Sequence, residues 1–424
     1  MEAQAQKNII VVGGGFAGIN FIKKISKYKQ FKITLVDKNN YHFFPPLLYQ
    51  VATAFIELSN ISYPFRRMFQ EQKNLRFHLG CLVKINPDSN TIETDTGVLE
   101  YDYLVLALGA ETNFFGNENV KRNALPMKNI NDALNLRNHL LLNMEKAVKI
   151  NDPGERKMHL NMVIAGGGPT GVEIAGMLAE MGQNIVRKEY PELKDFSGRI
   201  YLVDAGPALL GPMSEKSQKE ATRVLTNLGV QVKLNTAVND YKDKKVYLAN
   251  GEIISSNVLI WAAGITGITI PGLNDNVIGS GKRIKVDAFN KVIHTENIYA
   301  IGDICLQTAD PGFLEGHPQL AQVAIQQGKN LASNLHHLAR KENMKPFVYN
   351  DKGTMAIISK FKAVVDLPKL FFKGFFAWIM WLFIHIIPIA GYRNKLKLAA
   401  NWFWSFITND PTLRLIVRPE EKEV

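Results

Sequence analysis

Residues 9–18 read Ile-Ile-Val-Val-Gly-Gly-Gly-Phe-Ala-Gly, and residues 162–173 read Met-Val-Ile-Ala-Gly-Gly-Gly-Pro-Thr-Gly-Val-Glu. Each stretch is an apolar run, then glycines spaced as G-x-G-x-x-G, then a segment of helical character. The first glycine makes a tight turn, the second lets a pyrophosphate approach the backbone, and the third lets helix and strand pack closely. The helix N-terminus offers free N–H groups to the phosphates. We therefore predict two bound dinucleotides, between which electrons can pass.

An acidic residue ends the second strand of each predicted unit. Asp37 lies 19 residues after Gly18, where a carboxylate accepts hydrogen bonds from a ribose. Asp204 lies 33 residues after Gly171, which is too long for a minimal βαβ unit, so residues 183–198 are interpreted as an insertion. No arginine follows Asp204 to meet a 2′-phosphate, so the second site is predicted to bind NADH rather than NADPH. The alternative is that Asp204 merely ends a strand.

The two halves share more than the glycines. Residues 103–110 and 258–264 are predicted to be buried parallel strands that end in Ala-x-Gly. Residues 297–303 form one further short strand ending in Gly-Asp, and residues 319–340 are predicted to be a helix. These features predict an α/β protein with two Rossmann-like dinucleotide-binding domains.

Charge and cysteine content indicate the compartment of the protein and its binding partners. Residues 360–418 contain nine Lys and Arg and two Asp, so this segment carries seven of the eleven net positive charges of the chain. No nucleic-acid module or metal-binding cluster is evident, and the same segment is rich in aromatic residues, which favours an anionic membrane surface. Two cysteines make no disulfide framework, and the polar N-terminus is not a secretory or transit signal. We expect the cytoplasmic side of a bacterial membrane.

The C-terminal segment has a composition suited to a membrane interface. Residues 374–390 carry no charge apart from a protonatable His385, and at 17 residues they fall short of the roughly 20 that span a bilayer. A second aromatic stretch, residues 402–406, follows a basic one. Paired amphipathic segments of this kind predict a monotopic anchor lying in the interface. A transmembrane helix is the alternative, and a homodimer interface is compatible with either.

Several motifs together resemble one family. They are Phe-Pro-Pro-Leu-Leu-Tyr-Gln-Val-Ala-Thr at residues 44–53, Ala-Gln-Val-Ala-Ile-Gln-Gln-Gly at residues 321–328, and Ala-Trp-Ile-Met-Trp at residues 377–381 with His385. With the two fingerprints they are similar to the type II NADH:quinone oxidoreductases, which are single-subunit, non-pumping respiratory flavoproteins. The sequence departs from the family pattern at Ala54, where glycine is usual, and at residues 359–360, where Ser-Lys replaces Gly-Arg.

The resemblance implies FAD and NADH as cofactor and substrate, and a membrane quinone as acceptor. It implies domains at residues 1–115 (FAD, first part), 116–275 (NADH), 276–340 (FAD, second part) and 341–424 (membrane anchor). It also implies FAD or NADH contacts from the residues in and around the motifs: Gly13, Gly15, Phe16, Ala17, Gly18, Asp37, Lys38, Tyr49, Gln50, Val83, Ala107, Gly109, Asp303, Gly166, Gly168, Thr170, Gly171, Glu173, Asp204, Ala263 and Gly264.

Four residues are implied in the chemistry. Glu173, in the first turn of the second fingerprint helix, would contact nicotinamide and deliver a proton, although an acid there also suits the helix dipole. Gln322 and Gln326 lie on one helix face and would bind a quinone carbonyl, or else are surface glutamines. Lys362 would stabilise negative charge on reduced flavin, or else faces the membrane.

Two other functions stay open. A sulfide:quinone oxidoreductase would share the fold, but it needs a pair of redox cysteines, whereas this chain has only Cys81 and Cys305. A flavin-based redox sensor that binds NADH is the other alternative, against which the paired glutamines and the anchor argue.

Overall fold

The structure is a computed structural model that describes residues 6–193, 198–408 and 413–417. The chain divides into two compact units. Unit 1 comprises residues 1–43, 63–111 and 265–351, and unit 2 comprises residues 44–62, 112–264 and 352–424. Each unit contains one of the two glycine fingerprints, so each is described separately below.

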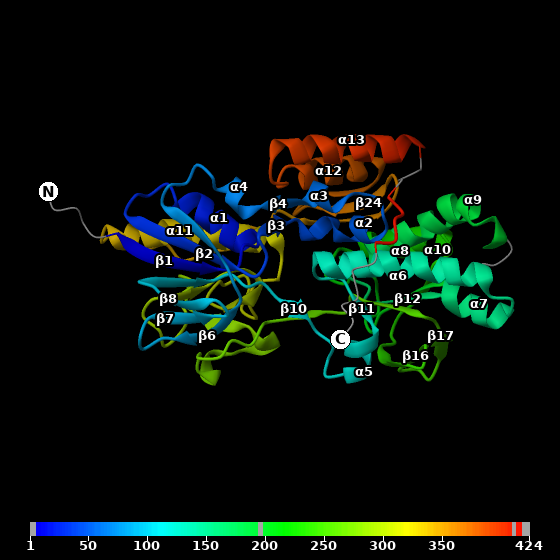
Figure 1. Cartoon of the computed structure of the whole chain (residues 1–424), viewed down its shortest axis with the longest axis horizontal. Helices are drawn as coiled ribbons and strands as arrows, with labels where there is room; N and C mark the ends of the chain where they lie inside the picture. Colours follow the sequence, from blue (N-terminus) through cyan, green and yellow to red (C-terminus); the bar gives the residue numbers. More distant parts are fainter. Residues whose placement is uncertain (1–5, 194–197, 409–412, 418–424) are drawn as a thin grey trace. The chain divides into compact units, whose positions relative to one another are not determined.

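Unit 1 is built on a parallel sheet of five strands in the order β21-β9-β1-β2-β5. Apolar side chains alternate between its two faces, as a sheet covered on both sides requires. Ile9 and Val11 pack on one face beneath two helices that lie side by side, α1 and α11, whereas Ile10 and Val12 pack on the other (Figure 1). The elements are β1 (Lys7–Val12), α1 (Phe16–Ile25), β2 (Phe31–Asp37), β5 (Leu75–Leu79), β9 (Tyr103–Leu106), β21 (Ile298–Ala300) and α11 (Ala321–Ala339).

The second face of this sheet is covered by smaller elements. A three-stranded antiparallel sheet contributes Ile85 and Ile92 to the same core cluster as Ile10 and Val12. The remaining elements of unit 1 are β3 (Tyr41–Phe43), α4 (Phe65–Met68), β6 (Leu82–Asn86), β7 (Thr91–Thr94), β8 (Gly97–Glu100), β19 (Ile265–Thr266), η4 (Asp275–Val277), η5 (Ser280–Lys282), β20 (Ile284–Val286), η6 (Gly302–Ile304) and β22 (Cys305–Gln307). Two short strands contain residues at which the chain passes between units, β4 (Ser62–Pro64) and β10 (Glu111–Thr112).

Unit 2 repeats the plan with a parallel sheet in the order β11-β18-β12-β13-β14. Strand β12 lies between β13 and β18, as β1 lies between β2 and β9 in unit 1. The elements are α5 (Glu118–Asn123), β11 (Leu125–Pro126), α6 (Ile130–Lys149), α7 (Pro153–Leu160), β12 (Met162–Ala165), α8 (Pro169–Met181), β13 (Ile200–Val203), α10 (Glu215–Asn227), β14 (Gln231–Lys233), β15 (Val238–Lys242), β16 (Lys245–Leu248), β17 (Ile253–Ser255) and β18 (Val258–Trp261).

The C-terminal part of the chain completes unit 2. An antiparallel sheet of β23 (Thr354–Ser359), β24 (Lys362–Asp366) and β25 (Phe371–Gly374) packs against α8, and the helices α12 (Phe375–Ile386) and α13 (Tyr392–Thr408) follow it. Figure 1 shows these two helices in orange and red, lying beside each other. Short helices from the N-terminal third belong to the same unit: η1 (Pro45–Leu47), α2 (Leu48–Ala52) and α3 (Leu58–Ile61).

The predicted boundaries and the compact units differ in five places. Residues 44–62, 112–115 and 352–424 belong to unit 2, whereas residues 265–275 and 341–351 belong to unit 1. Side-chain contacts explain the first difference, because Gln50 on α2 accepts a hydrogen bond from Trp402 on α13. Residues 265–275 pack into unit 1 at Gly272, where a Cβ would lie 1.7 Å from the carbonyl oxygen of Ile85. The predicted C-terminal region is therefore packed into a domain rather than separate from one.

The predicted insertion between α8 and β13 is helical where the structure describes it. It contains the π-helix η2 (Gly182–Val186), α9 (Arg187–Glu189) and η3 (Pro191–Leu193). Residues 194–197 of the insertion lie outside the described residues.

Candidate functional site

The first fingerprint forms an open turn at the start of α1. Gly13 has a φ of +105°, and a Cβ there would lie 2.3 Å from the carbonyl oxygen of Ala107. A Cβ on Gly18 would lie 2.0 Å from the oxygen of Gly13, so helix and strand meet at closest approach. At Gly15, by contrast, a Cβ would have no other atom within 4 Å. The middle glycine therefore faces open space beside the helix N-terminus, where a pyrophosphate fits.

The second fingerprint has the same geometry. Gly166 has a φ of +109°, and its Cβ would lie 2.3 Å from the oxygen of Ala262. A Cβ on Gly171 would lie 1.8 Å from the oxygen of Gly166, and nothing lies within 4 Å at Gly168. Both units thus contain a cradle of the shape that a dinucleotide pyrophosphate requires.

The two strand-end acids hold these turns in place. The Asp37 carboxylate accepts a hydrogen bond from the N–H of Gly14 at 2.7 Å, and Asp204 accepts one from Gly167 at 2.5 Å. Burial raises the pKa of the Asp37 carboxyl above its usual value, and the N–H groups of Asn39 and Gly14 oppose that rise. Each acid therefore fixes its glycine turn, and its contact with a ribose stays a prediction.

Unit 1 contains a buried histidine that the sequence analysis missed. His42 donates its Nδ1–H to the carbonyl oxygen of Gly14 at 3.0 Å and lies edge-on to Phe16. Burial lowers its pKa to about 4, so the imidazole is neutral at physiological pH. His42 lies five residues after Asp37, on β3, and no motif or spacing in the sequence singles it out.

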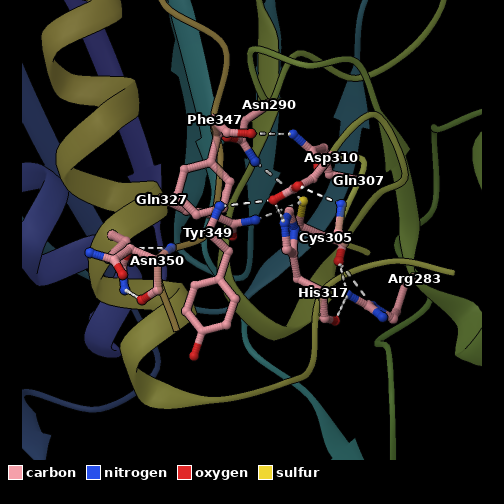
Figure 2. Close-up of polar contacts among 12 residues, drawn as sticks. Arg283, Asn290, Cys305, Gln307, Asp310, His317, Gln327, Phe347, Tyr349 and Asn350 are labelled. Atoms are coloured by element: carbon pink, nitrogen blue, oxygen red, sulfur yellow. Dashed lines mark hydrogen bonds and ion pairs between the residues drawn. The ribbon is translucent and has the colours of Figure 1, made fainter. Parts of the chain in front are cut away.

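A buried glutamine orders the Gly-Asp turn that contains Asp303. The N–H of Gly302, whose φ is +77°, donates to the side-chain oxygen of Gln327 at 2.7 Å. The Nε2 of Gln327 lies 3.7 Å from the Sγ of Cys305 (Figure 2). Residue 327 follows the predicted quinone residue Gln326, and its position on the buried side of α11 is the signal that could have found it.

The Gln326 amide is paired with backbone in the structure. Its Nε2 donates to the oxygen of Asn350 at 2.9 Å, and the N–H of Asn350 donates to its Oε1 at 3.1 Å (Figure 2). The Nε2 of His317 forms a buried hydrogen bond with Asp310 at 2.9 Å, and Asp310 also accepts from the N–H of Tyr349, so these contacts hold this part of the chain together. The two bonds with Asn350 use one amide hydrogen and one lone pair of Gln326, and its contact with a quinone stays a prediction.

Gln322 and Lys362 differ in their exposure. Gln322 is half-buried one turn before Gln326 on α11. Lys362 begins β24, and its side chain is exposed. Their roles toward quinone and flavin stay predictions.

Glu173 lies in the interior of unit 2. Its side chain is 9% exposed, and its carboxyl accepts a hydrogen bond from the N–H of Ile357 on β23. Burial raises its pKa well above the usual value, which favours the protonated form of this acid. A helix-dipole role would favour the charged form instead, so burial is the stronger influence.

A hydrogen-bonded chain leads from α13 to the neighbourhood of Glu173. Trp402 donates its indole N–H to the Oε1 of Gln50 at 2.8 Å, and the Nε2 of Gln50 donates to the Tyr49 hydroxyl at 3.0 Å. Burial, then the charge of Glu173, and then that of Glu180 raise the pKa of Tyr49. Tyr49 and Gln50 are thus buried with the acids of α8, which is consistent with their predicted place at a cofactor pocket.

Other predicted contact residues vary in exposure. Lys38 and Thr170 are exposed, and Val83 on β6 is 48% exposed. The other predicted contact residues lie at the start of the first fingerprint helix or just after a sheet strand, as the fingerprint requires. Phe16 and Ala17 begin α1, Ala107 and Gly109 follow β9, and Ala263 and Gly264 follow β18.

Two cysteines belong to the described part of the chain, and both are free. Cys81 is exposed in the turn between β5 and β6, and Cys305 is fully buried on β22. Burial raises the pKa of the Cys305 thiol to about 12, so it is not a ready nucleophile. Among the described residues, no group of His, Cys, Asp or Glu has the arrangement of a metal site.

The C-terminal helices present both buried and exposed aromatic side chains. Trp378, Trp381 and Trp402 are buried in unit 2. Burial lowers the pKa of His385, which stacks on Trp381, to about 4. The exposed side chains of the pair include Phe375, Phe376, Phe383, Ile384, Ile387, Tyr392, Leu396, Phe403, Trp404 and Ile407. Within the described ranges, no helix combines the length and apolarity that crossing a membrane requires.

Comparison with known proteins decides the family. The family of the pyridine nucleotide-disulphide oxidoreductases matches residues 7–328. The type II NADH:quinone oxidoreductase NdhA of Mycobacterium tuberculosis is 34% identical, over 94% of this chain and 87% of its own. The chain belongs to the type II NADH:quinone oxidoreductases. A relative of that name from Haemophilus influenzae is 29% identical, over 87% of this chain and 88% of its own.

Solved structures agree on the fold of this type II NADH:quinone oxidoreductase. NDH2 of Plasmodium falciparum in complex with NADH has a TM-score of 0.88 and 23% identity, and it covers 97% of this chain and 100% of its own. The sulfide:quinone oxidoreductase of Aquifex aeolicus has a TM-score of 0.70 and 20% identity, over 94% and 91% of the two chains. The family and the two-cradle α/β fold expected from the sequence are both confirmed.

Proposed function

We propose that this protein transfers two electrons from NADH through bound FAD to a membrane quinone, without pumping protons. The cradle at Gly13–Gly18 would hold FAD and the one at Gly166–Gly171 would hold NADH. Bound flavin supplies the hydride-accepting and electron-donating chemistry. The chain itself binds, orients and supplies protons.

The observation that carries the proposal is the duplicated cradle. Each fingerprint combines a strained first glycine, an open second glycine and a closely packed third glycine with an acid on the turn. A single cradle would suit a dehydrogenase with one nucleotide. Two cradles in one chain suit an electron donor and an internal electron acceptor. The family name gives NADH as the donor and a quinone as the final acceptor.

Glu173 is the residue best suited to supply a proton. Quinone reduction consumes two electrons and two protons, whereas hydride transfer from NADH needs no protein acid. Burial favours the protonated form of Glu173, and a protonated carboxyl can donate a proton where a carboxylate could not. Gln322 and Gln326 would hydrogen-bond the quinone carbonyl, and Lys362 would stabilise negative charge near the flavin.

The exposed surface of α12 and α13 is proposed to bind the cytoplasmic face of a bacterial membrane. Phe376 and Phe383 are 75% and 65% exposed and lie seven residues apart, so they share one face of α12. Phe403 and Trp404 on α13 are 68% and 63% exposed. Contiguous exposed aromatics flanked by Lys and Arg are typical of an interfacial helix pair. A homodimer through the same region is compatible with this surface.

A sulfide:quinone oxidoreductase is disfavoured by the cysteines. That chemistry needs two redox cysteines beside the flavin, whereas Cys81 is exposed and Cys305 is buried and protonated, with both free. A redox sensor would share the cradles, and rapid reoxidation of the flavin by quinone separates it from an oxidoreductase.

A matched pair of substitutions tests the two cradles. Gly15→Val and Gly168→Val both add a side chain where no protein atom lies within 4 Å, so each should fold. We expect Gly15→Val to lose bound flavin. We expect Gly168→Val to keep flavin but to lose its bleaching by NADH in rapid mixing, while flavin reduced with dithionite is still reoxidised by quinone. If Gly168→Val lost flavin and Gly15→Val kept it, the assignment of the cradles would be reversed.

A further inference from the structure

The two cradles hold their central peptide in the same way but with different donors. The carbonyl oxygen of Gly14 accepts a hydrogen bond from the Nδ1–H of His42 at 3.0 Å. At the equivalent place in the second fingerprint, the carbonyl oxygen of Gly167 accepts from the backbone N–H of Leu210 at 2.8 Å. His42 and Leu210 each lie in the segment that follows the strand-end acid of their own unit. A side chain thus does in unit 1 what the backbone does in unit 2.

The orientation of this peptide decides where one backbone donor points. The carbonyl of Gly14 and the N–H of Gly15 belong to one planar trans peptide, so they point in opposite directions. A donor that fixes the carbonyl therefore turns the N–H of Gly15 away from His42. Among the described residues this N–H has no acceptor, and a Cβ on Gly15 would have no other atom within 4 Å. The N–H is thus available to a ligand in the cradle.

His42 is held in place by burial and by a ring contact. Its side chain is 6% exposed, and its ring lies edge-on to Phe16, with 5.6 Å between the ring centroids. Phe16 begins α1 directly after Gly15, so the imidazole contacts both the glycine turn and the start of the helix. A carbonyl oxygen can only accept, so the hydrogen of this bond belongs to Nδ1. Burial lowers the pKa of the imidazole to about 4, so its other nitrogen carries no proton.

We propose that His42 is a positioning residue for FAD, which holds the carbonyl of Gly14 so that the N–H of Gly15 is aimed at the FAD pyrophosphate. This role rests on the proposed function, because it takes FAD as the ligand of the first cradle. His42 acts through the backbone and need not touch FAD itself. Neither the fingerprint nor the motif at residues 44–53 includes His42.

The physical basis is that hydrogen bonds on the two sides of a peptide reinforce each other. A donor on the carbonyl polarises the peptide and makes its N–H a stronger donor. Pyrophosphate is an anionic acceptor, so its bond with the N–H of Gly15 is charge-assisted. Without the imidazole donor, this N–H loses both its direction and part of its polarity, so FAD should bind about tenfold more weakly. The second cradle should be unaffected, because its donor is the backbone of Leu210.

His42→Asn and His42→Leu form a matched pair. The two new side chains have nearly the same shape, and the amide nitrogen of asparagine stands at the same place along the side chain as Nδ1 of histidine. Both variants lose the ring contact with Phe16, but only leucine lacks an N–H donor. The quenching of FAD fluorescence by added flavin-free protein measures the dissociation constant. We expect His42→Asn to bind FAD within about twofold of the wild type, and His42→Leu to bind it about tenfold more weakly.

The Gly15 amide gives a readout that is independent of turnover. In protein made with ¹⁵N-labelled glycine, its NMR signal is the one that Gly15→Ala removes. Saturating FAD should move this amide proton downfield in the wild type and in His42→Asn, and much less in His42→Leu. The Gly168 amide, assigned in the same way, is the control. Added NAD⁺ should move it equally in all three proteins.

Equal FAD affinity in the two variants, or FAD binding to the wild type without movement of the Gly15 amide, would overturn the positioning role. Unequal movement of the Gly168 amide would also overturn it, because His42 would then support the fold as a whole. The wild-type measurement does not depend on whether any substitution is tolerated. A wild-type protein that binds no FAD would instead overturn the proposed function.

Discussion

At the scale of single residues, burial decides the chemistry of this protein more than charge pairing does. The carboxyls of Glu173 and Glu180 have raised pKa values, and the imidazoles of His42 and His385 have lowered ones, in each case mainly because burial disfavours the charged form. Burial therefore favours the protonated form of Glu173 and Glu180. A protonated carboxyl can donate a proton, whereas a carboxylate cannot.

The raised pKa of Glu180 predicts a pH-dependent stability. Its pKa is about 7 in the folded protein and 4.5 in the unfolded chain, so its contribution is fully present below about pH 4.5 and is lost as pH rises through 7. The difference in free energy of unfolding between wild type and Glu180→Gln should fall by at most about 3 kcal/mol from pH 4.5 to 8. Denaturant titrations at both pH values measure it. Glu215→Gln, which changes an exposed acid at the start of α10, should show no such fall. A flat difference for Glu180→Gln would contradict the raised pKa.

At the scale of elements, α13 is both a surface helix and part of a core. Trp402 is buried and bonded to Gln50, whereas Trp404, two residues later, is 63% exposed. Residues two apart on a helix point in different directions, so one helix can place one tryptophan inward and another outward. The helix thus joins the acid-containing interior of unit 2 to an exposed aromatic surface.

Replacing each tryptophan by phenylalanine separates these two roles. Trp402→Phe removes the N–H donor and leaves the buried Oε1 of Gln50 without it, which should lower the free energy of unfolding by about 1–3 kcal/mol. Trp404→Phe should change it by less than about 0.5 kcal/mol. Denaturant titration of the two variants measures both. Equal losses would mean that the hydrogen bond adds nothing.

The sequence predicted these elements unevenly, and distance along the chain explains why. The predicted helix at residues 319–340 and the fingerprint strands need only local periodicity and glycines, and they appear as α11, β1 and β12. The partnership of Gln50 with Trp402 joins residues 352 positions apart, so no local pattern could reveal it. The backbone pairing of Gln326 with Asn350 depends in the same way on how a distant loop folds back.

The sequence predicted what kind of site this is, but it did not predict the packing around individual side chains. The glycines and strand-end acids were visible because steric rules fix them in place. The enclosure of Glu180 could have been suspected from its spacing after Glu173 on α8, but an exposed acid on a helix can have the same spacing. Only the packing of β23 against α8 shows that the side chain is enclosed.

At the scale of the whole molecule, the exposed aromatic surface of α12 and α13 predicts membrane binding. Substitutions test this prediction better than a truncation does. Because Trp378, Trp381 and Trp402 are buried in unit 2, deleting residues 371–424 would damage a core as well as an anchor. A triple variant, Phe376→Ser with Phe383→Ser and Trp404→Ser, should instead keep the fold.

The variant should bind vesicles of mixed phosphatidylcholine and phosphatidylglycerol at least about tenfold more weakly, since each aromatic inserted into the interface contributes apolar burial. Flotation with the vesicles measures binding, and high salt should weaken it further by screening the basic residues. Phe115→Ser is the control, because Phe115 is 65% exposed but lies outside the two helices. Undiminished flotation of the triple variant would place the membrane contact elsewhere.

Each unit is built from three segments that are far apart in the sequence, and this has a consequence for synthesis on the ribosome. Unit 1 needs β21 and α11 beside strands made nearly 300 residues earlier, and unit 2 needs Trp402 to complete the surroundings of Gln50. Neither unit can close its core while its last segment is still within the exit tunnel. The nascent chain must therefore expose sheet edges and apolar faces for most of its translation, so production of this protein should depend strongly on ribosome-associated chaperones.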